Sequence, residues 1–138
     1  MAPTTDELLA SVPLFKNLSK KHIMKVSSLA TRIDGQAGKI LTREGEPGHE
    51  FIVVLEGEVE VRHGDEVVAT RGAGEYVGEI ALVDNRPRTA TVVAKTPVVI
   101  DVIGQREFTT LLADEPEIAE AIKATANERL SELGIPDQ

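Results

Sequence analysis

Glycine divides the middle of the chain into short segments, which limits the fold to architectures built from short strands. Between residues 31 and 104 glycines punctuate the chain, turn signals fall roughly every ten residues, and the segments between them are short and rich in β-branched side chains. Short strands separated by regular turns are typical of sandwiches and barrels. We therefore expect a run of strands, over Lys39–Arg43, Phe51–Leu55, Glu58–Arg62, Glu66–Thr70, Thr89–Ala94 and Val98–Ile103.

Helical spacing replaces this pattern near the N-terminus. Ser19 is suited to cap a helix, because its side chain can accept a hydrogen bond from a free N–H of the first turn. Ile23, Val26 and Leu29 then follow at intervals that place them on one helix face. The sequence predicts a helix here that buries this face.

Helical spacing returns after Gly104, first around Phe108 and then over a longer segment. Asp114, with Glu117 three residues later, resembles a capping box that would start the longer helix. That helix carries an apolar stripe at intervals of three and four residues, formed by Ile118, Ile122, Ala126, Leu130 and Leu133. We expect the stripe to pack against the strands, with a dimer helix as the alternative.

The order of these elements predicts a single domain over residues 1–138, of α+β class and mainly β. Its body would be a β-roll at residues 31–103, a double-stranded, jelly-roll-like β-helix. Helices at residues 1–30 and 104–134 would flank it. A chain of 138 residues is long enough to bury one sizeable core.

Composition excludes several classes of partner. The net charge of −8 makes nucleic acid an unfavourable partner, and no aromatic residues alternate with basic ones to stack on bases. The chain has no Cys, so disulfides and thiolate metal sites are excluded. No apolar stretch approaches the length of a membrane span, and the N-terminus does not resemble a signal peptide. We expect a cytoplasmic protein with no membrane and no nucleic acid partner.

The segment from residue 78 to residue 90 has the chemistry of a small anion site. Gly78 lets the backbone approach a ligand, and a helix start after it would offer free N–H groups to a phosphate. Arg88, after the rigid Pro87, can form a bidentate charge-assisted bond to phosphate oxygens. Glu79 would be repelled by that phosphate but could accept a hydrogen bond from a sugar hydroxyl. A phosphate and a sugar together describe a nucleotide.

The segment reads Gly-Glu-Ile-Ala-Leu from residue 78 and Pro-Arg-Thr-Ala-Thr-Val from residue 87. These motifs resemble the phosphate-binding cassette of the cyclic nucleotide-binding domain. This is the family of protein kinase regulatory subunits, cyclic-nucleotide-gated channels and the catabolite activator protein. The likeness covers nearly the whole chain: it begins at Pro13-Leu14-Phe15 and includes Gly45-Glu46, the Val-Leu-Glu-Gly-Glu-Val hairpin at residues 54–59 and Gly74-Glu75-Tyr76.

The resemblance implies a role for each residue of the cassette. Glu79 would hold the ribose 2′-hydroxyl and Arg88 the cyclic phosphate. Ile80 and Leu82 would sense occupancy and pass it to the C-terminal helices. Backbone groups would complete the phosphate cradle, at Gly78, Ile80, Ala81, Thr89 and Ala90.

The ligand implied by the resemblance is cyclic AMP or cyclic GMP, with no further cofactor. Thr89 occupies the position that selects the nucleotide in the family. Alanine there accompanies cyclic AMP in kinases, whereas Thr or Ser suits cyclic GMP because its hydroxyl reaches the guanine amino group. Thr does not exclude cyclic AMP, so the choice stays open.

Each residue also has a simpler interpretation. Arg88 could form a surface ion pair, Glu79 could be a carboxylate favoured by the helix dipole, and Thr89 could be an ordinary strand residue. Together in one cassette, they favour a regulatory sensor over an enzyme. Such a sensor would act on a protein effector that the sequence does not identify, as a monomer or a homodimer.

Two other function classes stay open. A ligand-free interaction scaffold would keep the fold but bind no nucleotide. A cupin-like metal enzyme would need at least three convergent ligands, and His49 has no partner histidine two residues away, so we expect no metal. The start at Met1 and the capped last helix lead us to expect a complete small protein, with a fragment of a larger regulator as the alternative.

Overall fold

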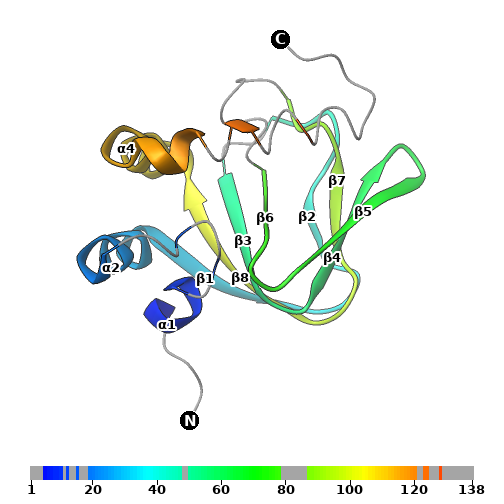
Figure 1. Ribbon diagram of the computed structural model, residues 1–138. Coiled ribbons are helices and arrows are strands. Elements are labelled where there is room, and N and C mark those ends of the chain that lie inside the picture. Colours follow the sequence, from blue (N-terminus) through cyan, green and yellow to red (C-terminus); the bar gives the residue numbers. More distant parts are fainter. Residues whose placement is uncertain are drawn as a thin grey trace.

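Two antiparallel sheets that pack against each other form the body of the protein in the computed structural model (Figure 1). The structure describes residues 5–10, 12, 15, 19–47, 50–78, 87–120, 123–124 and 128. Within these residues one sheet has the strand order β1-β8-β3-β6 and the other β2-β7-β4-β5. The strands are β1 (Ala30–Gly35), β2 (Ile40–Thr42), β3 (Glu50–Glu56), β4 (Glu58–His63), β5 (Glu66–Gly72), β6 (Tyr76–Val77), β7 (Thr91–Ala94) and β8 (Val98–Gly104). The predicted class, α+β and mainly β with a β-roll, is confirmed.

The space between the two sheets is filled by short aliphatic side chains. Ile52 and Val54 of β3 face inward and meet Val59 of β4 and Val92 of β7. Because β-branched side chains have few rotamers to lose, they suit this thin layer. The interior of the β-roll therefore contains no aromatic ring among the described residues that form it.

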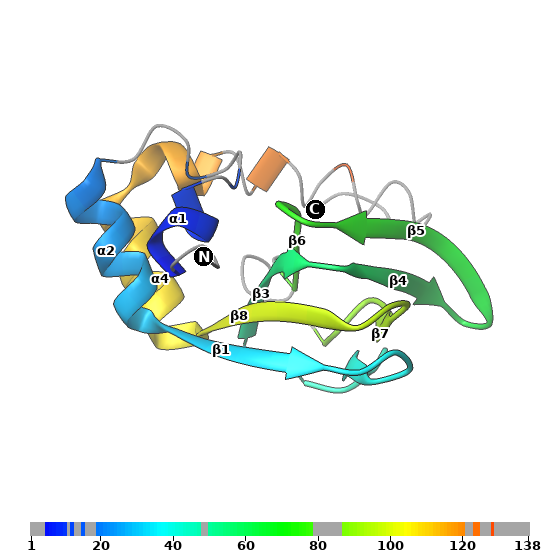
Figure 2. The ribbon, with the colours of Figure 1, turned by 90° about the horizontal axis from the view of Figure 1, so that it is seen from below.

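A second core lies on the outer face of the β3–β8 sheet, under the helices. Figure 2 shows the helices α1 (Thr5–Ala10), α2 (Lys20–Leu29) and α4 (Gln105–Asp114) gathered at one end of the β-roll. Alternate residues of β3 point into this second core, with Phe51 at its centre. The Phe51 ring lies 4.5 Å from that of Phe108 and 5.2 Å from that of Tyr76, measured between centroids. Since β3 is buried on both faces, its sequence is a continuous apolar run.

All four aromatic residues of the chain are buried in this second core. They are Phe15, Phe51, Tyr76 and Phe108. None of them is therefore exposed to stack on a nucleic acid base or on the base of a small nucleotide.

Helix α2 begins where the sequence predicts. Ser19 is the N-cap of α2, and its side-chain oxygen accepts a hydrogen bond of 3.2 Å from the backbone N–H of His22. The apolar face of α2 buries Ile23 and Val26. Helix α2 also carries His22 and Lys25, which contact Glu115 and Asp114 at the end of α4. The position at which α2 begins therefore matters to the rest of the fold.

Replacing Ser19 by alanine is expected to lower the free energy of unfolding by about 1 kcal/mol, because one N–H of the first turn loses its acceptor. Ser19→Asn keeps a capping oxygen and is the matched control, with an expected stability close to wild type. Urea unfolding followed by circular dichroism measures both. Equal losses in the two variants would mean that the cap does not stabilise α2.

The predicted set of strands is incomplete. It omits β1, which lies at the edge of its sheet and has only exposed and half-buried residues. Thr31, Arg32 and Asp34 interrupt any apolar run there, so the sequence carries no strand signal. The two-residue strand β6 is also absent from the prediction, because it is too short to show a period.

The predicted strand Thr89–Ala94 begins too early. The observed strand β7 begins at Thr91, and residues 89–90 form a bend. The cause is the backbone of Arg88, which pairs with the turn that precedes β3. Its N–H donates to the carbonyl of Glu46 at 2.9 Å, and its carbonyl accepts from the N–H of Gly45 at 2.8 Å.

Asp114 does not cap the longer C-terminal helix as predicted. It is the last residue of α4, and Glu115 separates α4 from further helical residues at 116–120. The side chain of Asp114 pairs with Lys25 of α2. Of the predicted apolar stripe, Ile118 is buried in the second core. The rest of the stripe, Ile122, Ala126, Leu130 and Leu133, lies outside the described residues.

Candidate functional site

Arg88 is the centre of the candidate site. It is 8% exposed, and its guanidinium donates to two backbone carbonyls, to that of Gly78 from Nη1 at 3.1 Å and to that of Glu50 from Nη2 at 2.8 Å. The backbone pairing with Gly45 and Glu46 fixes the Cα position as well. Both of these side-chain contacts are to carbonyl oxygens, and together they fix the orientation of the guanidinium.

Gly78 has the backbone conformation and the space that only glycine tolerates. Its φ is +92°, in the region that L residues rarely adopt. A Cβ built at this position would lie 2.6 Å from the carbonyl oxygen of Glu50 and 2.7 Å from Nη1 of Arg88. The missing side chain is therefore what allows the carbonyl of Gly78 and the guanidinium of Arg88 to meet.

The structure places half of the predicted site residues together. Gly78 and Arg88, ten residues apart in sequence, are in direct contact, and Thr89 and Ala90 follow Arg88 in the bend before β7. The other predicted site residues, Glu79, Ile80, Ala81 and Leu82, lie outside the described residues. Their roles stay predictions.

Sequence reasoning missed two features of this site. The carbonyl of Glu50 is one of them, because a backbone acceptor 38 residues from Arg88 leaves no trace in a local motif. The other is His63, which no sequence motif connects to the segment at residues 78–90. Its Nδ1 lies 3.2 Å from the carbonyl oxygen of Thr89 and 3.3 Å from a carboxylate oxygen of Glu44.

No cluster of three or more His, Asp or Glu side chains that could hold a metal occurs in the part of the chain that the structure describes. His22 and His63 each pair with a single glutamate, Glu115 and Glu44 respectively. His49, the histidine considered for a cupin-like site, lies outside the described residues.

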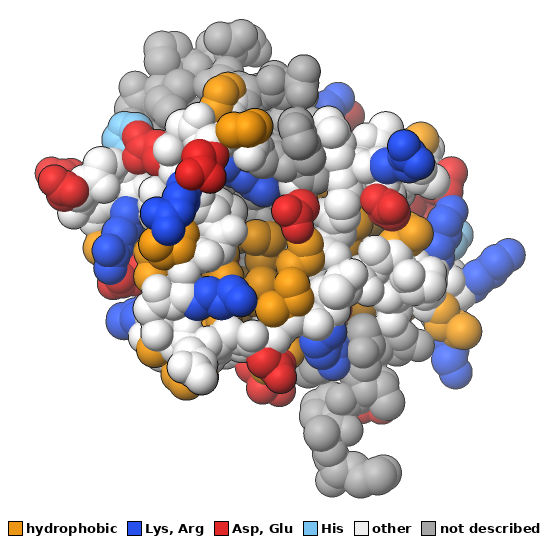
Figure 3. Space-filling model, turned by 180° about the vertical axis from the view of Figure 1, so that it is seen from behind, with side chains coloured by type: hydrophobic (Ala, Val, Ile, Leu, Met, Phe, Trp, Pro, Cys, Tyr) orange, Lys and Arg blue, Asp and Glu red, His pale blue; other side chains and the backbone are white. Residues whose placement is uncertain are grey.

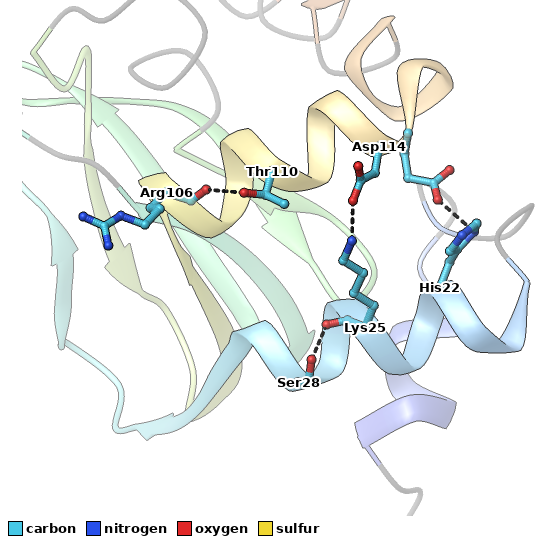
Figure 4. Close-up of polar contacts among 7 residues, drawn as sticks. His22, Lys25, Ser28, Arg106, Thr110 and Asp114 are labelled. Atoms are coloured by element: carbon cyan, nitrogen blue, oxygen red, sulfur yellow. Dashed lines mark hydrogen bonds and ion pairs between the residues drawn. The ribbon is translucent and has the colours of Figure 1, made fainter.

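The junction after α4 is held to α2 by an ion pair and by a histidine–carboxylate contact (Figure 4). Nδ1 of His22 lies 2.8 Å from the carboxylate of Glu115, and Nζ of Lys25 contacts the carboxylate of Asp114. Figure 4 shows both pairs side by side, bridging the two helices. The start of the residues after α4 is therefore anchored to the N-terminal helix as well as to the second core.

A separate groove of about 410 Å³ opens beside the β1 edge. The rear face of the molecule carries an exposed apolar patch with charged side chains around it (Figure 3). Among the residues that the structure describes, its lining includes two carboxylates and no Lys or Arg: Leu29, Thr31, Ile33, Glu50, Val102, Gly104 and Glu107. Two carboxylates in the described lining do not favour an anion, so we assign no second phosphate site to this groove.

No helix in the described part of the chain combines the length and the apolar character that crossing a membrane requires.

Comparisons with known proteins agree with the fold and show the family of the chain. The family model for the cyclic nucleotide-binding domain matches residues 34–115, which is more than half of the chain. The chain is 40% identical over 124 residues to a cyclic nucleotide-gated potassium channel of Rhizobium etli, covering 89% of this chain and 34% of the channel. This chain thus spans about a third or less of the length of the curated relatives that it matches.

Two solved structures show how closely the fold is shared. PKAR CBD2 bound to Sp-2Cl-cAMPS has a TM-score of 0.83 at 26% identity, covering 96% of this chain and 91% of that chain. The regulatory subunit of a cAMP-independent protein kinase A from Trypanosoma brucei has a TM-score of 0.82 at 27% identity, covering 90% of this chain and 46% of that chain. Because one similar structure holds a cyclic AMP analogue and the other belongs to a cAMP-independent kinase, the fold alone does not identify a ligand. The ligand therefore has to be inferred from the residues of the site.

Proposed function

Because this chain belongs to the cyclic nucleotide-binding domain family, we propose that it binds cyclic AMP or cyclic GMP at residues 78–90 and thereby regulates a protein effector. Domains of this family in kinase regulatory subunits are binding modules and not enzymes. The observation that carries the proposal is the arrangement of Arg88. A buried guanidinium, held in place by two carbonyls and facing a glycine, is preorganised for an anion.

The remaining contacts of the nucleotide follow from the family resemblance. Glu79 would accept a hydrogen bond from the ribose 2′-hydroxyl, and the backbone of Gly78, Ile80, Ala81, Thr89 and Ala90 would surround the phosphate. Since all four aromatic rings are buried in the second core, the base would be covered by non-aromatic side chains. Those side chains would include one from the helical residues after α4.

The proposed signal is a movement of the C-terminal helices, with Ile80 and Leu82 as the residues that sense occupancy. Such a movement has to act on the junction at Glu115, which the Lys25–Asp114 ion pair and the His22–Glu115 contact hold to α2. Nucleotide binding shifts this equilibrium only by the difference in its affinity for the two positions of the helices. A cytoplasmic location, the state as monomer or homodimer, and the absence of a nucleic acid partner stay predictions from the sequence.

Isothermal titration calorimetry with cyclic AMP and with cyclic GMP tests the proposal. We expect saturable binding of at least one nucleotide at a stoichiometry of one per chain. Heat from neither nucleotide, together with an unchanged unfolding temperature in the presence of both, would favour the ligand-free scaffold and overturn the proposal.

Thr89→Ala tests how the nucleotide is chosen. We expect the affinity for cyclic GMP to fall about fivefold and that for cyclic AMP to stay the same, because one hydrogen bond to the guanine amino group contributes about 1 kcal/mol. The same calorimetric titrations measure both constants. A parallel change for the two nucleotides would show that the Thr89 hydroxyl does not read the base.

A further inference from the structure

A small polar network holds the backbone immediately after Arg88. His63, the last residue of β4, places Nδ1 3.2 Å from the carbonyl oxygen of Thr89. The same nitrogen lies 3.3 Å from Oε2 of Glu44, in the turn after β2, while Oε1 of Glu44 accepts from the backbone N–H of Gly64 at 2.8 Å. The network joins three segments that are far apart in sequence.

The direction of the hydrogen bonds follows from the atoms involved. A carbonyl oxygen and a carboxylate oxygen can only accept, so the contacts of His63 are favourable only when Nδ1 carries a hydrogen. The imidazole therefore donates from Nδ1, shared between the carbonyl of Thr89 and the carboxylate of Glu44. The negative charge of Glu44 stabilises a ring held in this form.

These contacts fix the orientation of a peptide group in the candidate phosphate cradle. The peptide bond between Thr89 and Ala90 is trans, so its N–H points away from its carbonyl. With the carbonyl of Thr89 turned toward His63, the N–H of Ala90 is turned to the opposite side. The next carbonyl, that of Ala90, accepts from Oγ1 of Thr42 at 3.1 Å, so Ala90 is held on both sides.

The peptide group between Thr89 and Ala90 has to be oriented by side chains, because residues 89–90 are in a bend and not in a strand. Elsewhere in the roll, hydrogen bonds along the strands orient the peptide groups. Here the backbone of Arg88 is bonded to Gly45 and Glu46, and the peptide that follows is oriented by His63. A donor that is held before the ligand arrives costs less to order when the ligand binds.

We infer that His63, supported by Glu44, is a positioning residue for nucleotide binding, which orients the N–H of Ala90 toward the cyclic phosphate. The inference rests on the proposed function, because it assigns a phosphate contact to a backbone group of that site. His63 itself does not touch the ligand. Its effect passes through the Thr89 carbonyl.

Affinity measurements on variants of His63 test this role. We expect His63→Ala to bind cyclic AMP and cyclic GMP about tenfold more weakly than wild type. His63→Asn places a side-chain N–H close to the position of Nδ1 and is expected to recover most of the loss. Glu44→Gln is expected to weaken binding about threefold. Asp65→Asn removes a charge from an exposed residue of the turn between β4 and β5. It is the matched control and should bind like wild type.

Phosphorothioate analogues of cyclic AMP separate positioning from a general loss of structure. Sulfur replaces one of the two exocyclic phosphate oxygens in each diastereomer and accepts hydrogen bonds poorly. If the Ala90 N–H donates to one of these oxygens, His63→Ala should weaken cyclic AMP and one diastereomer about tenfold, and the other diastereomer threefold or less. Competition against a labelled cyclic nucleotide measures all three ligands.

The outcomes are distinguishable. Equal weakening of cyclic AMP and both diastereomers, or no recovery in His63→Asn, would mean that the network only stabilises the hairpin. Either result would overturn the inference but not the proposed function. Unchanged affinity in His63→Ala would overturn the inference too. If the wild-type protein binds no cyclic nucleotide, it is the proposed function that fails.

Discussion

Replacing Arg88 by alanine is expected to weaken cyclic nucleotide binding by about a hundredfold or more. A charge-assisted hydrogen bond contributes about 1.5–3 kcal/mol, and a guanidinium can form two of them to one phosphate. Since about 1.4 kcal/mol corresponds to a factor of ten in affinity, two such bonds account for the expected loss. Calorimetry with the nucleotide that wild type prefers measures it directly.

Arg88→Ala also removes the donors that serve the carbonyls of Gly78 and Glu50. The variant is therefore expected to unfold more easily, because both carbonyls are part-buried and a fully buried acceptor without a partner costs about 1–3 kcal/mol. Arg88→Lys is a second variant, which tests the same role if Arg88→Ala does not fold. It keeps the positive charge but loses the fork of donors, and we expect an intermediate loss of affinity.

Arg43→Ala is the matched control for charge. Arg43 is exposed in the turn after β2, so this change lowers the net charge as much as Arg88→Ala does but removes no group of the site. We expect it to bind like wild type. If Arg88→Ala folds and binds as tightly as Arg43→Ala, Arg88 is not the phosphate ligand.

The sequence predicts those parts of the fold in which the cause is local. The run at Phe51–Leu55 is a strand because every side chain in it is apolar and mostly β-branched, and Ser19 begins a helix because its oxygen reaches the first turn. The strand at Ala30–Gly35 could not be predicted in this way. Its pairing with β8 depends on residues about 70 positions away, at Val98–Ile103, and its own side chains are largely polar.

In the candidate site too, the sequence predicts the features with a local cause and not those that depend on distant residues. The types and spacing of Gly78 and Arg88 predict an anion site, because each residue has a chemical property that such a site needs. The acceptor at Glu50 and the donor at His63 could not be predicted, since both reach the site through strand pairing. The bend at residues 89–90 was missed for the same reason, because the turn at Gly45 and Glu46 competes for the backbone of Arg88.

Replacing Gly78 by alanine is expected to weaken nucleotide binding at least thirtyfold, although it removes no group that contacts the ligand through a side chain. The added Cβ would lie 2.7 Å from Nη1 of Arg88 and 2.6 Å from the carbonyl oxygen of Glu50. Both are far inside van der Waals contact, so the guanidinium and the backbone have to shift. A misplaced guanidinium loses the geometry of a bidentate bond, and about 2 kcal/mol of lost interaction corresponds to a factor of thirty.

Gly38 provides a matched control, because its φ is also +92° and a Cβ there would meet nothing within 4 Å. Gly38→Ala therefore imposes the same backbone strain, about 1–2 kcal/mol of stability, without touching Arg88. We expect it to lower the free energy of unfolding but to leave the affinity unchanged. Urea unfolding and calorimetry on both variants separate the strain of the backbone from the displacement of the guanidinium.

The double variant decides whether Gly78 acts through Arg88. If the glycine serves only to let the guanidinium approach, then Gly78→Ala should cost little further affinity once Arg88 is already alanine, because the two changes remove the same interaction. Additive losses would mean that the backbone of Gly78 contacts the ligand by itself. An affinity of Gly78→Ala equal to that of Gly38→Ala would show that the close approach at Gly78 has no part in binding.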